Sequence, residues 1–453
     1  MKRDFGEGTV WKIVLSQAIP LMLAQLVQLL YNVVDRIYIG HMPEIGSLAL
    51  TGVGLTFPII TFIIAFAAMF GIGGVPLFSI ANGAGDHGRA ERILGNSCCL
   101  LIIGSACLMA VGYTFCRPVL FLLGAGERSY PYAAAYLRFY LTGTLFSMLT
   151  TGLNGYISAQ GYPKTGMLTT VIGAVVNIAL DPLFIFTFGL GVSGAAIATV
   201  ISQAISAVWI LHFLLRRAPL RLKAGNVRID ADLTKRICRL GTSNFVMQGT
   251  NCFVQAACNS TLQLFGGDLF VGVMTVANSI RDIFQMPVHG LRDGAQPVMS
   301  FNYGAQKYSR VKEAIRFNTA SGALYTAFAW VLVVLFPAFW FRIFSGDPEM
   351  IAAGVPAIRI YFFGFVFMAL QFSGQAAFQA LGDARHAIFF SLLRKVVIVI
   401  PLTLLLPRLG LGVNGVFIAE PISNVIGGLA CYLTMHRTVY RKLTLAEQSQ
   451  NRD

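Results

Sequence analysis

The sequence is poor in charged residues. Only 12% of its 453 residues are Asp, Glu, Lys or Arg, whereas an average soluble domain carries about 25%. Hydrophobic residues make up 56% of the chain, and the mean hydropathy is +0.68. Segments of about ten residues that alternate apolar and polar side chains are missing, which argues against the strands of a membrane barrel. The composition excludes an ordinary soluble protein.

The sequence also lacks the motifs of an enzyme or of an ATP-driven pump. It has no GxxxxGK[ST] loop, so we expect no ATP site. Its eight cysteines are not spaced as metal ligands, and its six histidines are scattered, so we expect neither a metal site nor a nucleophile–base pair. The net charge of +14 reflects basic loops between apolar segments and does not indicate a nucleic-acid partner. We predict a protein that is not an enzyme and needs no cofactor.

Long apolar runs recur along the whole chain. Each is long enough to cross the roughly 30 Å of hydrocarbon in a bilayer as a helix. We therefore predict an all-α polytopic membrane protein with twelve transmembrane helices in two six-helix lobes. The predicted spans are 12–39, 47–80, 92–115, 131–160, 165–187, 192–215, 235–264, 268–302, 311–340, 350–380, 385–406 and 412–436.

The second half of the sequence repeats the first at one fixed offset. Pro76 matches Pro297, which is 221 positions later (297 minus 76), and the run 189–194 matches 410–415 at the same offset. Six helices per repeat is an even number, so both repeats enter from the same side, and we expect a pseudo-two-fold along the membrane normal. The expected organisation is an N-lobe (1–215), a basic cytoplasmic linker (216–233), a C-lobe (234–440) and a cytoplasmic tail (441–453).

Basic residues predict the orientation of the chain. They are concentrated in the segments that lie on one side of the predicted spans, including Arg216, Arg217 and Arg236, and the opposite segments hold few. Because such residues mark the cytoplasmic side, we expect both termini in the cytoplasm. We predict a multi-pass protein of the plasma (inner) membrane, a monomer whose partners are the lipid bilayer and a small organic substrate.

Two acids lie inside predicted membrane helices of the first lobe. A charge inside a bilayer is costly, so Asp35 and Asp181 are candidate functional residues. Both helices run outward, and both acids lie within roughly 10 Å of the outer boundary. Tyr31 and Asn177 each precede an acid by four residues, on the same helix face. Tyr136 and Thr199 reach a similar depth from the outside.

The repeat provides a comparison for these acids. The second-lobe equivalents of Asp35 and Asp181 are Ala256 and Leu402, so the fold does not require a carboxylate at either position. Two nearby carboxylates in a dry site cannot both ionise cheaply, and one of them should hold a proton near neutral pH. Alternatively, Asp35, Asn177, Asp181 and Thr199 form a Na⁺ site together with a carbonyl freed by Pro20. We expect loading to change the bend of the first helix at Pro20.

Several features resemble the MATE family of multidrug and toxic compound extrusion transporters. They are the two six-helix lobes, Pro20 with Asp35 fifteen residues later, the turn at Ala159-Gln160-Gly161, and Pro297, Ser300 and Asn302-Tyr303-Gly304-Ala305. The chain looks closest to the DinF-like branch. In that branch the equivalents of Pro20, Tyr31, Asp35, Tyr136, Asn177, Asp181 and Thr199 form the polar network of the first lobe. The resemblance implies export of amphiphilic, often cationic, organic compounds by alternating access, in exchange for H⁺ or Na⁺.

The second lobe carries a different set of charges. We select Asn154, Arg281, Asp282, Gln285, Arg292, Asp293 and Glu420 as candidates for a substrate cavity. Internal ion pairing is the simpler interpretation of the charged residues, and lining of a water-filled cavity is the other. Together with Arg394 and Lys395, the basic side chains keep an alternative function open. The protein would then be a flippase or exporter of lipid-linked precursors or anionic metabolites in the same superfamily.

Overall fold

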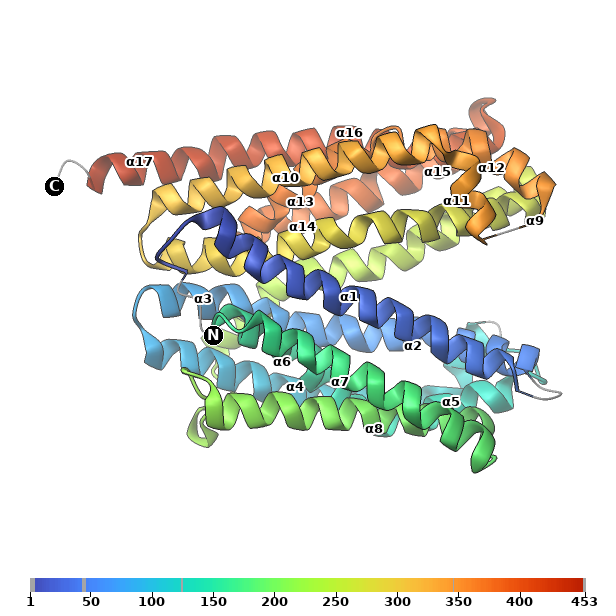
Figure 1. Cartoon of the computed structure of the whole chain (residues 1–453), viewed down its shortest axis with the longest axis horizontal. Coiled ribbons are helices and arrows are strands. Elements are labelled where there is room, and N and C mark those ends of the chain that lie inside the picture. Colours follow the sequence, from blue (N-terminus) through green and yellow to red (C-terminus); the bar gives the residue numbers. More distant parts are fainter. Residues whose placement is uncertain (1–4, 43–45, 124, 345, 451–453) are drawn as a thin grey trace. The chain divides into compact units, whose positions relative to one another are not determined.

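The computed structural model describes residues 5–42, 46–123, 125–344 and 346–450. The predicted positions 1–4 of the N-lobe and 451–453 of the tail lie outside the described residues. Within these ranges the chain is helical and contains no strand (Figure 1). Its internal contacts divide it into two compact units, here called unit 1 (residues 20–245 of the described chain) and unit 2 (5–19 and 246–450).

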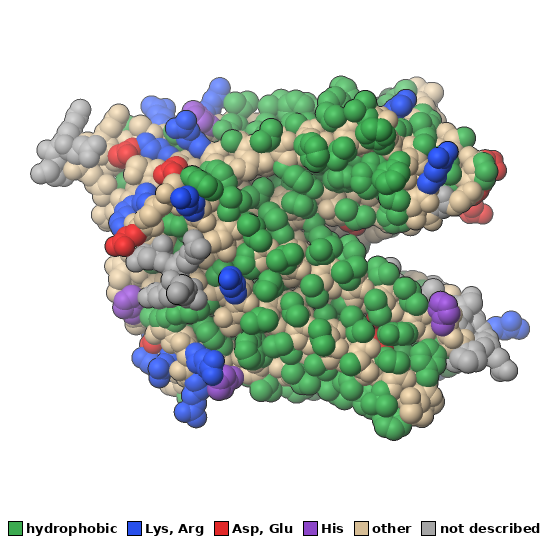
Figure 2. Space-filling model, in the orientation of Figure 1, with side chains coloured by type: hydrophobic (Ala, Val, Ile, Leu, Met, Phe, Trp, Pro, Cys, Tyr) green, Lys and Arg blue, Asp and Glu red, His purple; other side chains and the backbone are tan. Residues whose placement is uncertain are grey.

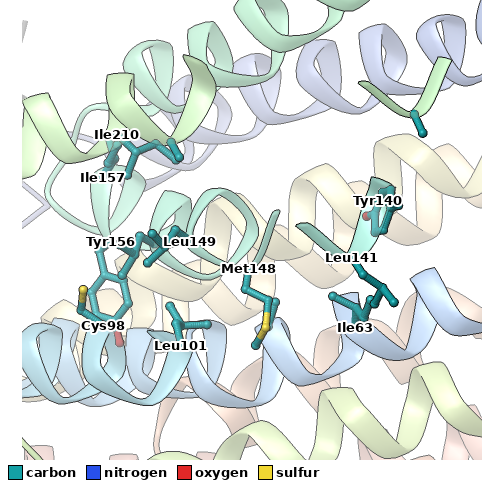
Figure 3. Packing of buried hydrophobic residues seen from close by; sticks show 14 of the residues in the cluster. Ile63, Cys98, Leu101, Tyr140, Leu141, Met148, Leu149, Tyr156, Ile157 and Ile210 are labelled. Carbon is teal, nitrogen blue, oxygen red and sulfur yellow. The ribbon is translucent and has the colours of Figure 1, made fainter. Parts of the chain in front are cut away.

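Unit 1 contains the helices of the first repeat. They are α1 (Val10–Gly40) from Pro20 onward, α2 (Gly46–Phe70), η1 (Ile72–Gly74), α3 (Val75–Gly83), α4 (His87–Leu122), α5 (Tyr130–Thr142), α6 (Thr144–Ala159), α7 (Pro163–Pro182), η2 (Leu183–Thr187), α8 (Gly191–His212), η3 (Phe213–Arg217), η4 (Ala224–Asn226) and the start of α9 (Ala231–Gly304). Its hydrophobic core includes Tyr156, whose hydroxyl donates to the Ser97 Oγ at 2.6 Å, together with Cys98, Leu101 and Met148 (Figure 3).

Unit 2 contains the helices of the second repeat. They are the rest of α9, α10 (Tyr308–Leu335), α11 (Pro337–Phe344), α12 (Pro348–Tyr361), α13 (Phe365–Ala380), α14 (Ala384–Leu392), η5 (Leu393–Val399), α15 (Ile400–Leu405), η6 (Pro407–Leu409), α16 (Gly412–Met435), η7 (His436–Tyr440) and α17 (Arg441–Gln450). The segment η5 is π-helical. Pro401 follows it and cannot donate to the carbonyl of residue 397, which explains a widened turn at this point.

Among the described residues, nine helices are long and apolar enough to cross a membrane, or ten if α12 and α13, bent by 47°, form one span. The remaining predicted spans come from two local features. Helix α9 contains two spans in its 74 residues, divided at Gly267 with φ 66° and ψ −166°, a conformation open to glycine alone. The span predicted at 131–160 consists of the shorter α5 and α6. The predicted fold class, an all-α polytopic protein with two lobes of six spans, is confirmed.

The repeat extends to backbone conformation. Glycines with positive φ recur at the 221-residue offset, as in Gly161 (86°) and Gly382 (80°) and in Gly189 (65°) and Gly410 (96°). Gln306 has a φ of 58° and is the one non-glycine residue with positive φ in the described chain. Its equivalent is Gly85, with a φ of 78°. The two repeats therefore make the same turns even where the residue type differs.

The units differ in their boundaries from the predicted lobes. The first helical turns of α1 belong to unit 2 up to Ile19, and the first turns of α9 belong to unit 1 up to Phe245. The predicted linker 216–233 is also packed within unit 1. There the backbone N–H of Leu220 donates to the buried Oε1 of Gln160 at 2.9 Å. The predicted lobes were divided at loops, whereas the two units divide inside the helices α1 and α9.

Apolar side chains cover the outer faces of the helices. Figure 2 shows hydrophobic side chains over the middle of the visible face, with Lys and Arg gathered toward helix ends. Large apolar residues remain exposed on both units, for example Val208 at 64% and Leu324 at 75%. A surface of this kind suits a hydrocarbon environment, where apolar side chains carry no hydration cost.

Candidate functional site

The acids of the first lobe lie inside unit 1 on two helices. Asp35 is on α1 and is 7% exposed, and Asp181 is on α7 and is fully buried. The structure brings these two carboxyl groups together. The side chains of Asp35 and Asn177 are the close neighbours that interact with the Asp181 carboxyl. Neither of these two neighbours is cationic. One proton or one small cation would relieve the repulsion between the two acids.

A hydroxyl and an amide complete the oxygen-rich centre of this site. The Nδ2 of Asn177 donates to the Thr199 Oγ1 at 3.3 Å, and Thr199 in turn donates to the carbonyl of Ala195 on its own helix α8 at 3.0 Å. The Oδ1 of Asn177 and both carboxylate oxygens of Asp181 are buried. These oxygens are hard ligands of the kind that Na⁺ and other hard cations prefer.

Two tyrosines also belong to this site. The hydroxyls of Tyr31 and Tyr136 both lie within reach of Thr199 and Asp35. The ring of Tyr136 stacks on that of Tyr140, with 6.2 Å between centroids. The Tyr140 hydroxyl lies 3.3 Å from the Ser147 Oγ and accepts from the Nε2 of Gln203 at 3.5 Å. Sequence reasoning missed Tyr140 and Gln203, because an aromatic or an amide in an apolar helix is not conspicuous.

Pro20 lies far from these oxygens. It is buried inside α1, which continues as one helix to Gly40. Fifteen helical residues separate Pro20 from Asp35, which is about 22 Å along the helix, and the carbonyl that a proline frees lies four residues earlier still. The expectation that this carbonyl joins a Na⁺ site is therefore wrong. Pro20 instead marks the position where α1 changes from unit 2 to unit 1.

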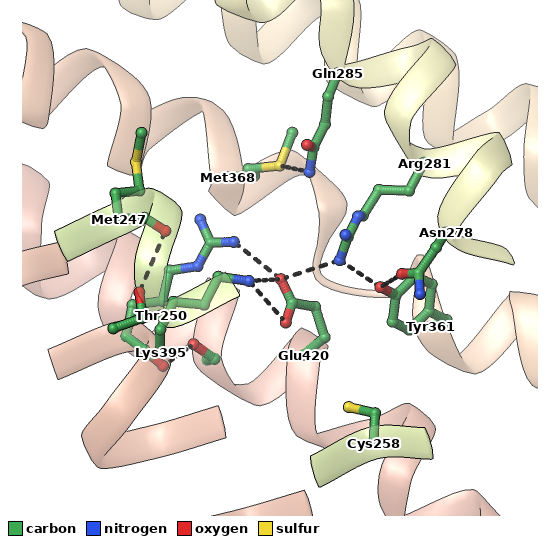
Figure 4. Close-up of polar contacts among 12 residues, drawn as sticks. Met247, Thr250, Cys258, Asn278, Arg281, Gln285, Tyr361, Met368, Lys395 and Glu420 are labelled. Carbon is green, nitrogen blue, oxygen red and sulfur yellow. Dashed lines mark hydrogen bonds and ion pairs between the residues drawn. The ribbon is translucent and has the colours of Figure 1, made fainter. Parts of the chain in front are cut away.

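A second buried polar cluster lies inside unit 2 and is centred on Glu420 of α16. The Nη2 of Arg394 lies 2.9 Å from Glu420 Oε1, and the Nζ of Lys395 lies 3.2 Å from the same oxygen. The Nη1 of Arg281, on α9, approaches that oxygen at 3.6 Å. Figure 4 shows Glu420 between Lys395 and Arg281, with their side chains directed at its carboxylate. Three basic groups thus converge on one acid.

Tyr361 connects this cluster to the neighbouring helix. Arg281 donates to the Tyr361 hydroxyl, which itself donates to the Oδ1 of Asn278 at 2.7 Å. Asp282 lies 3.8 Å from Arg281, but its side chain is 62% exposed. The Nε2 of Gln285 lies 3.1 Å from the Met368 sulfur. Internal ion pairing is therefore present, as the simpler interpretation predicted, although Arg281 pairs more closely with Glu420 than with its neighbour Asp282.

Two cavities adjoin the Glu420 cluster within unit 2. One, of about 210 Å³, is lined by Arg281, Asp282, Lys395 and Glu420 together with neutral polar residues, including Asn251, Gln255 and Asn278. The other, of about 120 Å³, shares Asn251, Arg281, Asp282 and Lys395 and adds Gln285, His289 and Arg394. Four of the predicted cavity residues, Arg281, Asp282, Gln285 and Glu420, therefore do line cavities.

The other predicted cavity residues are placed differently. Arg292 and Asp293 pair with each other at 2.7 Å, and the Arg292 guanidinium lies 5.7 Å from the centroid of the Phe372 ring. Asn154 belongs to unit 1, where its amide donates to the carbonyl of Gly166 at 3.2 Å and joins α6 to α7. None of these three lines either of the two cavities beside Glu420. Their conspicuous polarity in sequence reflects local pairing.

Comparison with known proteins gives one family. The MatE family model matches residues 20–183 and again 245–405, so each repeat matches separately. The multidrug export protein MepA of Staphylococcus haemolyticus (strain JCSC1435) is 24% identical over 451 residues, covering 98% of both chains. A protein of Shewanella oneidensis (strain MR-1) named FAD transporter is 25% identical, covering 94% of this chain and 95% of its own.

Solved structures share the fold. A MOP superfamily transporter from Pyrococcus furiosus, described by the reverse polarity of its binding pocket, superposes with a TM-score of 0.90 at 24% identity and 98% coverage of both chains. A MATE transporter in the bent conformation gives a TM-score of 0.91 at 24% identity, covering 98% of this chain and 97% of that one. With its two repeats matching the family model across most of its length, this chain belongs to the MatE family of multidrug efflux transporters.

Proposed function

We propose that this protein is a secondary active transporter that exports amphiphilic organic compounds, often cationic, in exchange for H⁺ or Na⁺. The observation that carries the proposal is the pair of carboxyl groups, Asp35 and Asp181, that lie together and buried inside unit 1. Buried acids in a membrane helix are costly to keep. Their second-repeat equivalents are apolar, so they serve something other than the fold.

Ion exchange follows from the chemistry of this site. When both acids are ionised, their negative charges repel each other. One bound proton neutralises one of the two charges, and one bound Na⁺ offsets one of them. The oxygens of Asn177 and Thr199 add neutral ligands that suit Na⁺, and Tyr31 and Tyr136 lie beside Thr199 and Asp35. Loading and release of the ion on opposite sides of the membrane would couple its gradient to solute export by alternating access.

The proposal includes the location and orientation of the protein in the membrane. We place the protein in the plasma (inner) membrane as a monomer with both termini in the cytoplasm, because its basic residues gather in loops on one side of the spans. The DinF-like assignment follows from the acids being in the first lobe. Export of anionic or lipid-linked compounds is the second candidate function. It is favoured by the three basic side chains around Glu420.

Transport by purified protein tests the proposal. Liposomes are loaded with the fluorescent cation ethidium, and a pH gradient or a Na⁺ gradient is imposed separately. One gradient should drive export by the wild type, and Asp35→Asn and Asp181→Asn should each abolish that drive. Glu313→Gln, which removes an exposed acid on α10, is the matched control and should transport normally. If neither gradient drives wild-type export, or if both Asn variants remain coupled, the proposed mechanism is wrong.

A further inference from the structure

We propose that the second lobe contains a binding site for an acidic group, a phosphate or a carboxylate, of a transported solute, formed by Arg281, Arg394 and Lys395 around Glu420. This inference rests on the proposed transport function and adds to its substrate class compounds that carry such a group. All residues of this site belong to unit 2, and they line the two cavities described above.

The first argument is an excess of buried positive charge. The side chains of Arg394 and Lys395 are 8% and 9% exposed, and that of Arg281 is 21% exposed. They face one carboxylate, Glu420, so three positive charges meet one negative charge. Asp282 adds a second acid, but it lies at 3.8 Å and is largely exposed. Buried charges in proteins are normally paired, so the cluster as it stands is short of negative charge.

The second argument is that donors remain available. The Nε of Arg394 and the Nε of Arg281 are buried and donate to no described group. Arg394 as a whole residue is 7% exposed and lines the smaller cavity. A guanidinium offers five donors in a planar fork that matches a carboxylate or a phosphate, and Glu420 occupies only part of that capacity. An incoming acidic group would find charge-assisted donors already oriented.

The third argument is the room beside Arg281 and Lys395. The larger cavity measures about 210 Å³, and roughly 10–15 Å³ of such space holds one water molecule. The cavity therefore has space for an acidic group and part of the carbon skeleton that bears it. Neutral hydrogen-bonding side chains, including Asn251, Gln255 and Asn278, line the same cavity. Such residues bind polar solute atoms without opposing the charge of the acidic group.

The fourth argument comes from the repeat. The first-lobe equivalents of Arg281, Arg394 and Lys395 are Ile60, Gly173 and Ala174, each 221 residues earlier. The same fold is thus built in unit 1 without any of these charges. Arg394 and Lys395 stand on the π-helical segment η5, and wide turns of this kind occur frequently at functional sites.

Thermal unfolding of the full-length protein tests the inference through binding alone. The protein is placed in phosphatidylcholine nanodiscs and titrated with phenyl phosphate, with benzoate and with the neutral analogue benzyl alcohol at constant ionic strength. A ligand that binds the folded state raises the unfolding temperature. We expect a saturable rise with one or both of the acidic probes and none with benzyl alcohol. Equal behaviour of all three probes would overturn the inference.

Variants locate the effect. In Arg394→Gln/Lys395→Gln, the concentration for the half-maximal rise should increase at least about tenfold, because charge-assisted hydrogen bonds are lost. Arg394→Lys/Lys395→Arg keeps both charges and should recover most of the response, which also guards against a folding defect. Arg408→Gln removes an exposed basic residue of the same lobe and should behave as wild type. A response unchanged in the Gln double variant contradicts the site.

Two further comparisons separate the possible outcomes. Nanodiscs that contain phosphatidylglycerol offer acidic headgroups. If these abolish the response to both acidic probes, the site binds a lipid headgroup and the solute assignment is wrong. Asp181→Asn should retain the full response, because its carboxyl belongs to unit 1. Loss of ion-driven transport in that variant with intact probe binding shows that the two sites act separately. If transport proves uncoupled from both ions while probe binding persists, the proposed function fails and this site stands.

Discussion

Thr199 and Glu420 occupy equivalent positions in the two repeats, 221 residues apart, and each lies buried at the centre of a polar cluster. Thr199 on α8 accepts from Asn177 beside two acids, and Glu420 on α16 is held by three basic groups. Tyr140 and Tyr361 stand in the same relation and contact the respective clusters. The same position in the fold thus lies beside acidic side chains in the first repeat and beside basic side chains in the second.

Removing the charge of Glu420 should destabilise the second lobe strongly. Glu420→Gln leaves three basic groups without their acid, and breaking a buried ion pair costs roughly 3–5 kcal/mol. The free energy of unfolding in detergent measures the loss, with Glu313→Gln as the exposed control. Adding Lys395→Met to Glu420→Gln should restore part of the stability by removing one unpaired charge. A Glu420→Gln protein as stable as wild type would show that the cluster is not an interacting unit.

Pro20 should act as a hinge rather than as a ligand. It lies where α1 passes from the contacts of unit 2 to those of unit 1, and a proline inside a helix removes one backbone hydrogen bond and permits a bend. Pro20→Ala should fold normally and transport more slowly, with ion binding at Asp35 and Asp181 unchanged. Transport rates in liposomes and ion binding in detergent are the two measurements. A Pro20→Ala protein that transports at the wild-type rate would contradict a hinge role for Pro20.

Gln306 should be replaceable by glycine with a gain in stability. Its φ of 58° lies in the left-handed region, which costs a residue with a side chain roughly 1 kcal/mol or more. Gln306→Gly should therefore raise the free energy of unfolding by about 1 kcal/mol, and Gly85→Ala, at the equivalent turn, should lower it by a similar amount. Opposite signs for the two variants are the expected outcome of chemical unfolding. The same sign for both would contradict the equivalence of the turns.

Arg310 should hold the segment before α1 against unit 2. Its guanidinium donates to the carbonyls of Phe5 and Gly8 at 3.1 and 2.8 Å, and Asn302 donates to the same Phe5 carbonyl at 2.9 Å. In Arg310→Ala, the amides of residues 5–9 should exchange hydrogen faster, by mass spectrometry, than in wild type. Arg89→Ala at the equivalent position of unit 1 is the control, and it should leave these amides unchanged. Equal exchange in both variants would show that Arg310 does not secure the segment.

The sequence was sufficient to predict most of the fold and the acidic site of the first lobe. Acids such as Asp35 and Asp181 are conspicuous in apolar helices. The helical spacing of Asn177 and the expected depth of Thr199 indicated that these residues are neighbours of the acids. The repeat could also have indicated Tyr140, because Tyr361 shares its position. By contrast, the convergence of Arg394, Lys395 and Arg281 on Glu420 is a tertiary contact between distant segments. The assignment of residues 5–19 to unit 2 is likewise invisible in a continuous apolar helix.

Competition between ion and solute at the first-lobe acids tests the central claim most directly. Purified protein in weakly buffered detergent solution is mixed with ethidium while a pH dye records released protons, and displacement of bound ²²Na⁺ is measured in parallel. We predict that the solute displaces one of the two ions from the wild type and from Glu313→Gln, and that Asp35→Asn and Asp181→Asn abolish the displacement. Solute binding that displaces neither ion, or displacement that persists in both Asn variants, would contradict the assignment of Asp35 and Asp181 as the coupling site.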